Sequence, residues 1–366
     1  MKKTFSILFA ILTLLSVAAF AASAEGETEY QYPTSGSFGA EGDNASWSID
    51  ENGKMTVSGT GAIKDATSGF PPQFSEKIKE LEVLPGITHI GNYIFSNFDN
   101  LIKVTLHEGL QSIGAYAFYT CRSLETFAIP DSVTEIGDQA FNHCISMDAF
   151  SVSENSKSFC AVDGVLFTKD MAELVAYPAG NRRTSYTVPD GVKLLRMASF
   201  RKAKQLLSIT LPDSLDVIEP CTFQDCFLLN SIRMPKTLRE LGTSSFVYCY
   251  ALTSIEIPEG VKTIYTGTFY SCSLLRTVHI PHSVTRIEAE AFSDCNLLGE
   301  IYYNGTAAEW DALDIQGQSM NFYTASMHFA DTDSNGGLFG RILSTLRNYF
   351  HAWRRYFEQF LKMFAV

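Results

Sequence analysis

Apolar and polar positions repeat with a fixed step through most of the chain. In one representative unit, Ile255 and Ile257 flank a polar residue, and this alternation predicts a short strand with one buried face. Pro258 follows directly, and because proline cannot donate to a ladder, it should end the pairing there. A second short extended piece is predicted to end at Ile264.

The rest of each unit should turn the chain back. A glycine follows the position of Ile264 in several units, at Gly91, Gly114, Gly137 and Gly242. Between Ile264 and Leu275, small, aromatic and cysteine residues recur at spacings of three or four. This spacing predicts one helical or 3₁₀ turn on the outer side of the unit.

Phenylalanines mark the same place in successive units, at a constant step of 23 along the sequence. They are Phe95, Phe118 and Phe141, then Phe200, Phe223, Phe246, Phe269 and Phe292. A fixed period of this length predicts a stacked-repeat protein, whose units bury one continuous core between them. Since the phenylalanines keep strict register with columns of Ile and Leu, we interpret them as core residues, not as exposed aromatic platforms.

The repeat resembles that of the BspA-type leucine-rich-repeat family of secreted or surface proteins. The stretch Leu124–Met147 (LETFAIPDSVTEIGDQAFNHCISM) follows the family pattern almost throughout, and the resemblance extends from Leu81 to Leu298. It implies a curved leucine-rich-repeat solenoid, built mostly of short strands. It also implies non-catalytic adhesion or protein–protein interaction with a host surface, the extracellular matrix or another microbe.

One irregularity interrupts the repeat, because the step from Phe141 to Phe200 is more than twice the usual one. Two alternating apolar runs, Phe159–Thr168 and Leu174–Pro178, surround a polar turn in this stretch. We expect a hairpin insertion near residues 148–187, within a solenoid that spans residues 78–298.

The first part of the chain differs from the repeats. Two lysines, an apolar stretch and an A-x-A site predict a signal peptide over residues 1–24, cleaved after Ala24, and hence a secreted or cell-surface protein. Residues 25–77 are expected to form a small N-terminal β capping module, since solenoid ends expose apolar edges. Residues 299–330 are expected to form the C-terminal cap.

The last part of the chain predicts a basic amphipathic helix. A linker at residues 331–337 precedes residues 338–366, where apolar side chains recur at steps of three and four. Five cations in this segment exclude a transmembrane helix, so we expect none in the mature chain. The helix contacts a membrane or the envelope, or packs on the solenoid or on a second copy. A further alternative is that the segment is processed or disordered. The candidate contact residues are Phe339, Phe350, Trp353, Arg354, Arg355, Phe357 and Phe360.

Charge is unevenly distributed between these parts. The whole chain carries −12, the tail +4 and the leader +2, which leaves −18 on residues 25–337. Such an acidic body argues against nucleic acid as a partner, because phosphates require a basic surface.

The cysteines form a ladder. Six of eight occupy one repeat position: Cys121, Cys144, Cys226, Cys249, Cys272 and Cys295. Parallel side chains, one per rung, do not converge as zinc ligands must, and bridging between rungs is awkward, so we expect free buried thiols. Cys160 and Cys221 lie off the ladder and are the candidates for pairing or reactivity. With no catalytic or phosphate-binding motif either, the sequence predicts no enzyme, metal or cofactor.

The candidate ligand face is the outward column of the first strand. It comprises Glu82, Thr105, Ala128, Thr187, Thr210, Arg233, Glu256 and His279. Nothing requires these side chains for the core, so they are free to bind a ligand or merely to be solvated. Adhesion through this face is our first hypothesis. The alternative is a structural component of the envelope or of a secreted assembly, acting through the C-terminal helix.

Overall fold

A computed structural model of the 366-residue chain describes residues 34–40, 44–67, 70 and 72–330. The predicted signal peptide, linker and C-terminal helix lie outside the described residues. The account below concerns the compact unit that begins at Gly36.

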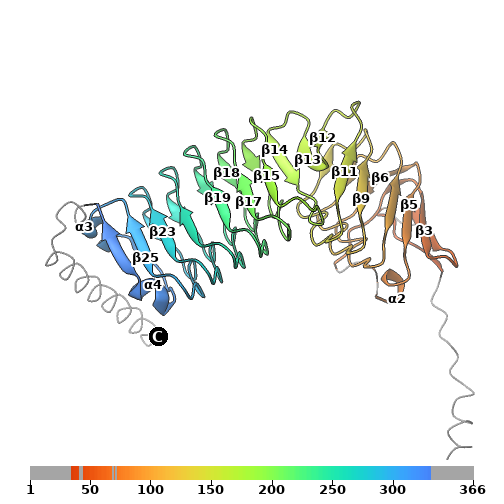
Figure 1. The fold of residues 1–366 in the computed structure, drawn as a ribbon. Coiled ribbons are helices and arrows are strands. Elements are labelled where there is room, and N and C mark those ends of the chain that lie inside the picture. The colour runs from red at the N-terminus through yellow and green to blue at the C-terminus, as the bar shows by residue number, and fades with distance from the viewer. Residues whose placement is uncertain (1–33, 41–43, 68–69, 71, 331–366) are drawn as a thin grey trace, which may run out of the picture. The chain divides into compact units, whose positions relative to one another are not determined.

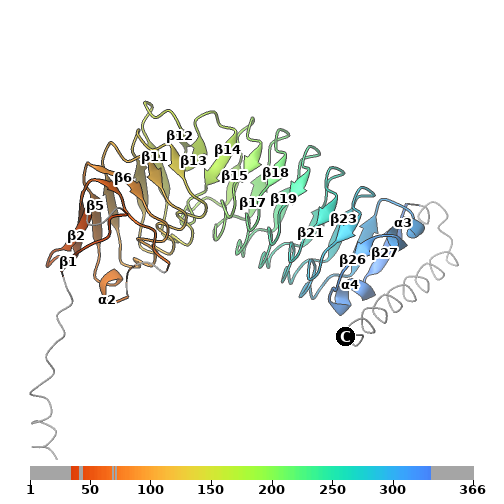
Figure 2. The same cartoon turned by 180° about the vertical axis from the view of Figure 1, so that it is seen from behind.

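Two short strands per coil build the solenoid, with equivalent strands of successive coils side by side (Figure 1, Figure 2). Within each ladder the pairing of neighbouring coils is parallel and follows the repeat, as for Glu82 beside Thr105 and Glu256 beside His279. We call the two series the first and the second sheet. The first-sheet strands are β3 (Lys54–Gly59), β5 (Glu80–Val83), β7 (Lys103–Leu106), β9 (Thr126–Ile129), β11 (Ala149–Val152), β15 (Ser185–Thr187), β17 (Ser208–Thr210), β19 (Ser231–Arg233), β21 (Ser254–Glu256), β23 (Thr277–Ile280), β25 (Glu300–Tyr303) and β27 (Ser326–Phe329).

The second sheet is narrower, with two to four residues per strand. Its strands are β4 (Gly61–Ala62), β6 (Ile87–Ile90), β8 (Ser112–Ile113), β10 (Glu135–Ile136), β14 (Glu173–Ala176), β16 (Leu194–Leu195), β18 (Val217–Ile218), β20 (Glu240–Leu241), β22 (Thr263–Ile264), β24 (Arg286–Ile287) and β26 (Asp314–Ile315).

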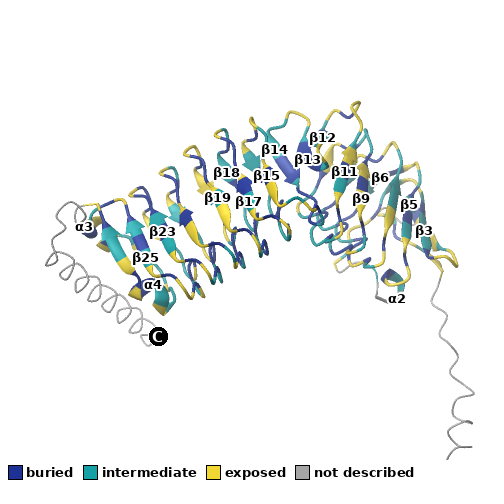
Figure 3. Cartoon of the chain, in the orientation of Figure 1, coloured by how far each residue is buried: buried dark blue, intermediate teal, exposed yellow. Residues whose placement is uncertain are grey.

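The core runs between the two sheets and the outer turns, as the apolar pattern predicted. Buried and exposed residues alternate along the first-sheet strands, so that Ile255 is buried and Glu256 exposed (Figure 3). The phenylalanine column is buried, and neighbouring rings stack, with the Phe246 and Phe269 centroids 5.4 Å apart. The interpretation of this column as core is therefore confirmed.

The predicted helical or 3₁₀ outer turn is wrong. In each regular turn the residues two before and two after the phenylalanine have positive φ, as in Ser244 (59°) and Tyr248 (62°) around Phe246. Left-handed residues cannot propagate a right-handed helix. The turn instead bonds to the next coil: the amides of Ser244, Phe246 and Tyr248 donate to three carbonyls, at 2.8–3.1 Å. The outer turns are thus an extension of the interstrand ladder.

The irregular coil lies between Phe141 and Tyr177. Tyr177 stands one repeat step before Phe200 and stacks on it at 4.9 Å, so it occupies the phenylalanine column. The stretch from Phe141 to Tyr177 therefore forms one enlarged coil.

The extra residues of this coil form an antiparallel meander, β12 (Phe159–Val162), β13 (Val165–Thr168) and β14. The sequence predicted one hairpin between the two apolar runs. The structure has that pairing, β13 with β14, and a second hairpin inside the first run. Asp163 and Gly164 turn this second hairpin with φ of 52° and 80°, a conformation that Asp-Gly pairs favour.

The meander separates two hydrophobic clusters. Val165 and Phe167 belong to the cluster that continues to Phe329, whereas Leu166 belongs to the cluster that begins at Phe38. Because successive side chains of a strand point to opposite faces, β13 contributes to both cores. Neither sheet is continuous here: β10 and β14 lie in different ladders, as do β11 and β15.

Both sheets extend beyond the predicted limits of residues 78–298. At the start, β2 (Ala45–Ile49) forms an antiparallel hairpin with β3, and β3 pairs in parallel with β5. At the end, β25, β26 and β27 add further rungs. The remaining elements are β1 (Ser35–Ser37) and three short helices: α2 (Pro72–Ser75), α3 (Ala307–Asp311) and α4 (Met320–Thr324). The residues assigned to caps therefore continue the stack, and their capping role stays a prediction.

Candidate ligand-binding face

The outward side chains of the first sheet form a surface that we call the strand face. Its central row runs one residue per coil through the column predicted from the sequence. In that column Thr187, Thr210, Arg233 and Glu256 are exposed, whereas Glu82, Thr105 and His279 are half-buried. Parallel pairing places Thr187 beside Thr210, and Thr210 beside Arg233.

The row is interrupted at the meander. Ala128 pairs with Ser151, a position that the sequence analysis did not include, and the ladder ends there. Thr187 begins a new ladder. The ladders therefore divide the predicted column into four parts: Glu82 with Thr105, Ala128, Thr187 to Arg233, and Glu256 with His279. The enlarged coil separates the first two parts, the N-terminal stretch, from the last two, the C-terminal stretch.

The N-terminal stretch carries a small charged cluster around Glu82. Lys54 Nζ lies 2.7 Å from one oxygen of Glu82, and His107 Nε2 lies 3.0 Å from the other. The hydrogen bond from Lys54 and then that from His107 lower the pKa of Glu82. Lys54 belongs to the segment assigned to the N-terminal module, so this contact escaped the sequence analysis.

The C-terminal stretch ends in a stack of rings. His279 and Tyr302 lie 4.6 Å apart with planes 12° from parallel, and Tyr302 and His328 lie 4.2 Å apart at 10°. His328 Nε2 lies 2.6 Å from Glu300 Oε2 in the adjacent column. Only His279 was predicted as a site residue. Tyr302 follows it by one repeat step and was detectable, whereas His328 follows Tyr302 by a longer step and was not.

Between the hydroxyl-rich and aromatic parts lie two charged residues. Arg233 ends β19 and Glu256 ends β21, on neighbouring coils. Among the described residues, neither takes part in an ion pair. Unpaired charges of opposite sign on neighbouring coils are available to a ligand's own charges and hydrogen-bonding groups.

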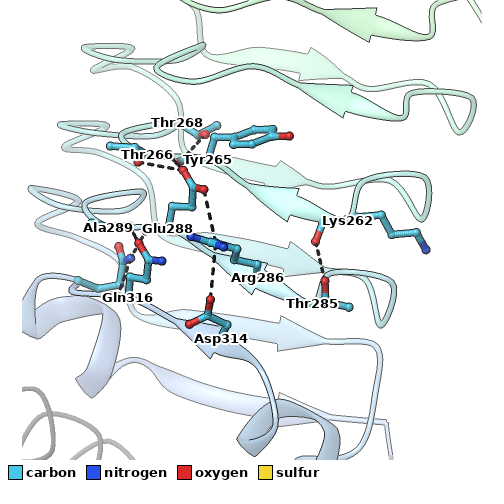
Figure 4. Close-up of polar contacts among 11 residues, drawn as sticks. Lys262, Tyr265, Thr266, Thr268, Thr285, Arg286, Glu288, Ala289, Asp314 and Gln316 are labelled. Carbon is cyan, nitrogen blue, oxygen red and sulfur yellow. Dashed lines mark hydrogen bonds and ion pairs between the residues drawn. The ribbon is translucent and has the colours of Figure 1, made fainter.

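The second sheet presents its charges differently. Arg286 on β24 lies between Glu288 and Asp314, with Nε 3.4 and 3.6 Å from their oxygens (Figure 4). Glu288 also accepts from the amide and hydroxyl of Thr266, at 3.1 and 3.0 Å (Figure 4). These charges bind one another across coils. Charges paired in this way, like those around Glu82, are less available to a ligand than Arg233 and Glu256.

A polar cleft of about 610 Å³ adjoins the interruption on the second-sheet side. Glu135, Asp138 and Arg196 line it, together with His89 and Ser112. Arg196 Nε lies 2.6 Å from Glu173, and its Nη1 donates to the Ile136 carbonyl at 3.4 Å. The arginine therefore links the coils on either side of the interruption.

The ladder cysteines are buried free thiols in the structure, as predicted. Cys160 and Cys221 are half-buried and also free. Within the described ranges, no group of His, Cys, Asp and Glu side chains is arranged to hold a metal ion, and no helix is long and apolar enough to cross a membrane. The predicted contact residues of the C-terminal helix, Phe339 to Phe360, fall outside the described residues.

Two parallel strands per coil, a stacked aromatic column and outer turns in register define a leucine-rich-repeat solenoid. The model of the BspA type leucine-rich repeat region matches residues 73–161 and 179–303 in six copies. The chain belongs to this family. The match corresponds to no enzyme family.

Solved structures share the fold. A leucine-rich cell surface protein from Faecalibacterium prausnitzii is 22% identical with a TM-score of 0.60, over 78% of this chain and 98% of that one. A leucine-rich-repeat protein from Eubacterium ventriosum is 25% identical with a TM-score of 0.55, over 74% and 85%. The pneumococcal vaccine antigen PcpA is 19% identical with a TM-score of 0.55, over 76% and 98%. Among curated proteins, no relative matches.

Proposed function

We propose that the protein is a non-catalytic binding protein, secreted or held at the cell surface, which contacts a protein ligand through the strand face. Family membership supports a binding role. The observation that carries the choice of face is the row from Thr187 to His328, where hydroxyls, two unpaired charges and stacked rings follow one another on successive coils.

The partner we propose is a protein of a host surface or of the extracellular matrix. Contacts along the row are individually modest, and they sum because the scaffold holds them in a fixed register. The acidic body, at −18 over residues 25–337, disfavours nucleic acid.

The alternative function is a structural role in the envelope or in a secreted assembly, acting through residues 338–366. Comparing the full chain with a variant ending at Ala330 distinguishes the two. A strand-face ligand stays bound with unchanged affinity when the tail is removed. Loss of envelope association in the shortened chain, with no matrix or host-cell protein bound by either, would transfer the function to the tail.

A further inference from the structure

At one position of the outer turn, the residues change from polar to apolar along the solenoid. Five residues after the column aromatic, the first coils carry polar residues: Asn100, Ser123, Ser146, Arg182 and Gln205. The following coils carry Leu228, Ala251, Leu274 and Leu297 instead. We call these four residues the leucine row.

The leucine row is accessible. Leu228, Leu274 and Leu297 are 45%, 43% and 40% exposed. Tyr250, beside the row, is 42% exposed and stacks on Phe227 at 5.5 Å. In the described part of the chain, eight large apolar side chains are exposed. Four of these, Leu228, Tyr250, Leu274 and Leu297, lie along one strip. Contiguous exposed apolar surface of this kind marks a contact site.

The strip lies towards the end of the solenoid at which the described chain stops. The Ala330 amide bonds to the Gly305 carbonyl at 3.0 Å, so the described chain ends in the closing coils, next to Leu297's own coil. A linker of seven residues spans at most about 25 Å, more than the roughly 14 Å of a four-residue strand. The segment that follows can therefore reach the row without any change in the solenoid.

The tail also has matching chemistry. Residues 338–366 present apolar side chains at helical spacing and carry +4, whereas the preceding body carries −18. As a helix the segment would be about 43 Å long, compared with about 15 Å for three steps along the row. Asp294 lies exposed at the turn beside Leu297. An apolar helix face fits the strip, and its arginines are attracted to a body of opposite net charge.

We propose that residues 338–366 dock on the leucine row of their own chain as an amphipathic helix. Docking covers the exposed leucines and the apolar face of the tail together. This intramolecular contact lies on the turn side of the molecule. It stands independently of ligand binding at the strand face.

Limited trypsin digestion of the full chain tests the proposal, because five of the possible cleavage sites lie in the tail, from Arg341 to Lys362. Leu274→Glu with Leu297→Glu should release the tail and speed its cleavage at least tenfold. The matched control, Ser146→Glu with Gln205→Glu, adds the same charges at the same turn position in earlier coils, and should leave the rate unchanged. Because all four residues lie in turns and none is buried, thermal melting should show both variants folded. Leu274→Gln with Leu297→Gln repeats the test without added charge.

Three results would overturn the proposal. In the first, the row variants and the wild type are cleaved at the same rate. In the second, protection of the wild-type tail rises with protein concentration, which would assign its apolar face to a second copy. In the third, the tail is cleaved rapidly in every variant and is protected only by vesicles of phosphatidylserine and phosphatidylcholine, which would place it on membranes.

Discussion

The thiol of Cys226 donates to the backbone carbonyl of Phe200 in the preceding coil, with Sγ 3.1 Å from the oxygen. All six ladder cysteines make the same contact with the carbonyl of a column aromatic one coil earlier, at 3.1–3.3 Å. Cysteine at this position is therefore both a small apolar residue and a hydrogen-bond donor. The ladder ties successive coils together inside the core.

Because the ladder cysteines are buried, we predict that their thiols react slowly in the native protein. Burial raises the pKa of Cys226 and of Cys295 to about 12, so the reactive thiolate is scarce at neutral pH. Native protein treated with iodoacetamide should be labelled only at Cys160 and Cys221, and all eight cysteines should react after unfolding. Mass spectrometry gives the sites. If the ladder cysteines of the native protein were labelled as fast as Cys160 and Cys221, the buried ladder would be contradicted.

Removing one thiol should cost stability. Cys272→Ala removes one of two donors to the Phe246 carbonyl, which keeps the Cys249 amide, and opens a small cavity. Together these changes should lower the free energy of unfolding by about 1–2 kcal/mol. Calorimetry of this variant beside Cys160→Ala, which changes a half-buried thiol outside the ladder, isolates the effect. A smaller loss for Cys272→Ala than for Cys160→Ala would be inconsistent with the assigned role.

The aromatic column should be the most sensitive part of the core. Phe246 is fully buried between Phe223 and Phe269, at 5.1 and 5.4 Å, so Phe246→Ala should cost about 3–5 kcal/mol. Tyr250→Ala, at an exposed ring four residues later, is the control and should change stability little. Denaturant titration measures both. Similar losses for the two variants would show that the column is not the dominant core contact.

Gly114, directly after β8, is predicted to be required by the close approach of the preceding coil. A Cβ on Gly114 would lie 2.7 Å from the Asn92 backbone nitrogen, whereas one on Gly299 would meet nothing closer than 3.8 Å. Gly114→Ala should therefore lower the melting temperature, and Gly299→Ala should leave it nearly unchanged. If Gly114→Ala melts with the wild type, the coils are more loosely spaced than described.

His143 should make stability depend on pH. Burial, and then the nearby cations Lys202 and Arg201, lower its pKa from about 6.5 to about 4. The unfolded chain then takes up a proton at a higher pH than the native state. The contribution of His143 to the free energy of unfolding is constant above about pH 6.5 and is lost as the pH falls from there towards 4. His143→Asn, which tolerates the φ of 65°, should flatten the melting-temperature profile in this window. An unchanged slope would contradict the neutral, buried state of His143.

Several features of the fold were predictable because every coil repeats the same packing problem. Buried positions such as Ile255 and Phe269 recur at one step, and each alternates with polar neighbours, so register and core follow from the sequence. The left-handed turn residues were not predictable, since Tyr93, Gln139 and Tyr248 are not residue types that commonly adopt positive φ. Their conformation is imposed by hydrogen bonds to the next coil.

The site was predictable only where the repeat is regular. Thr210 and Arg233 follow from the period, and the long step from Phe141 to Phe200 indicates an insertion, but the period does not show that the ladders end there. Tyr302 follows His279 by one regular step and could have been included, whereas His328 follows Tyr302 by a longer step, so its stacking on Tyr302 is seen only in the structure.

The strand face as ligand surface is tested most directly by binding of the full chain to a panel of matrix proteins and host cells at physiological salt. One variant combines Arg233→Gln, Glu256→Gln and Tyr302→Ala. The control combines Glu240→Gln, on β20, with Lys262→Gln, directly before β22, and loses the same one positive and one negative charge. We predict saturable binding by the wild type and the control, and at least tenfold weaker binding by the strand-face variant. Equal affinity of all three proteins for the same ligand would contradict the assignment of the strand face.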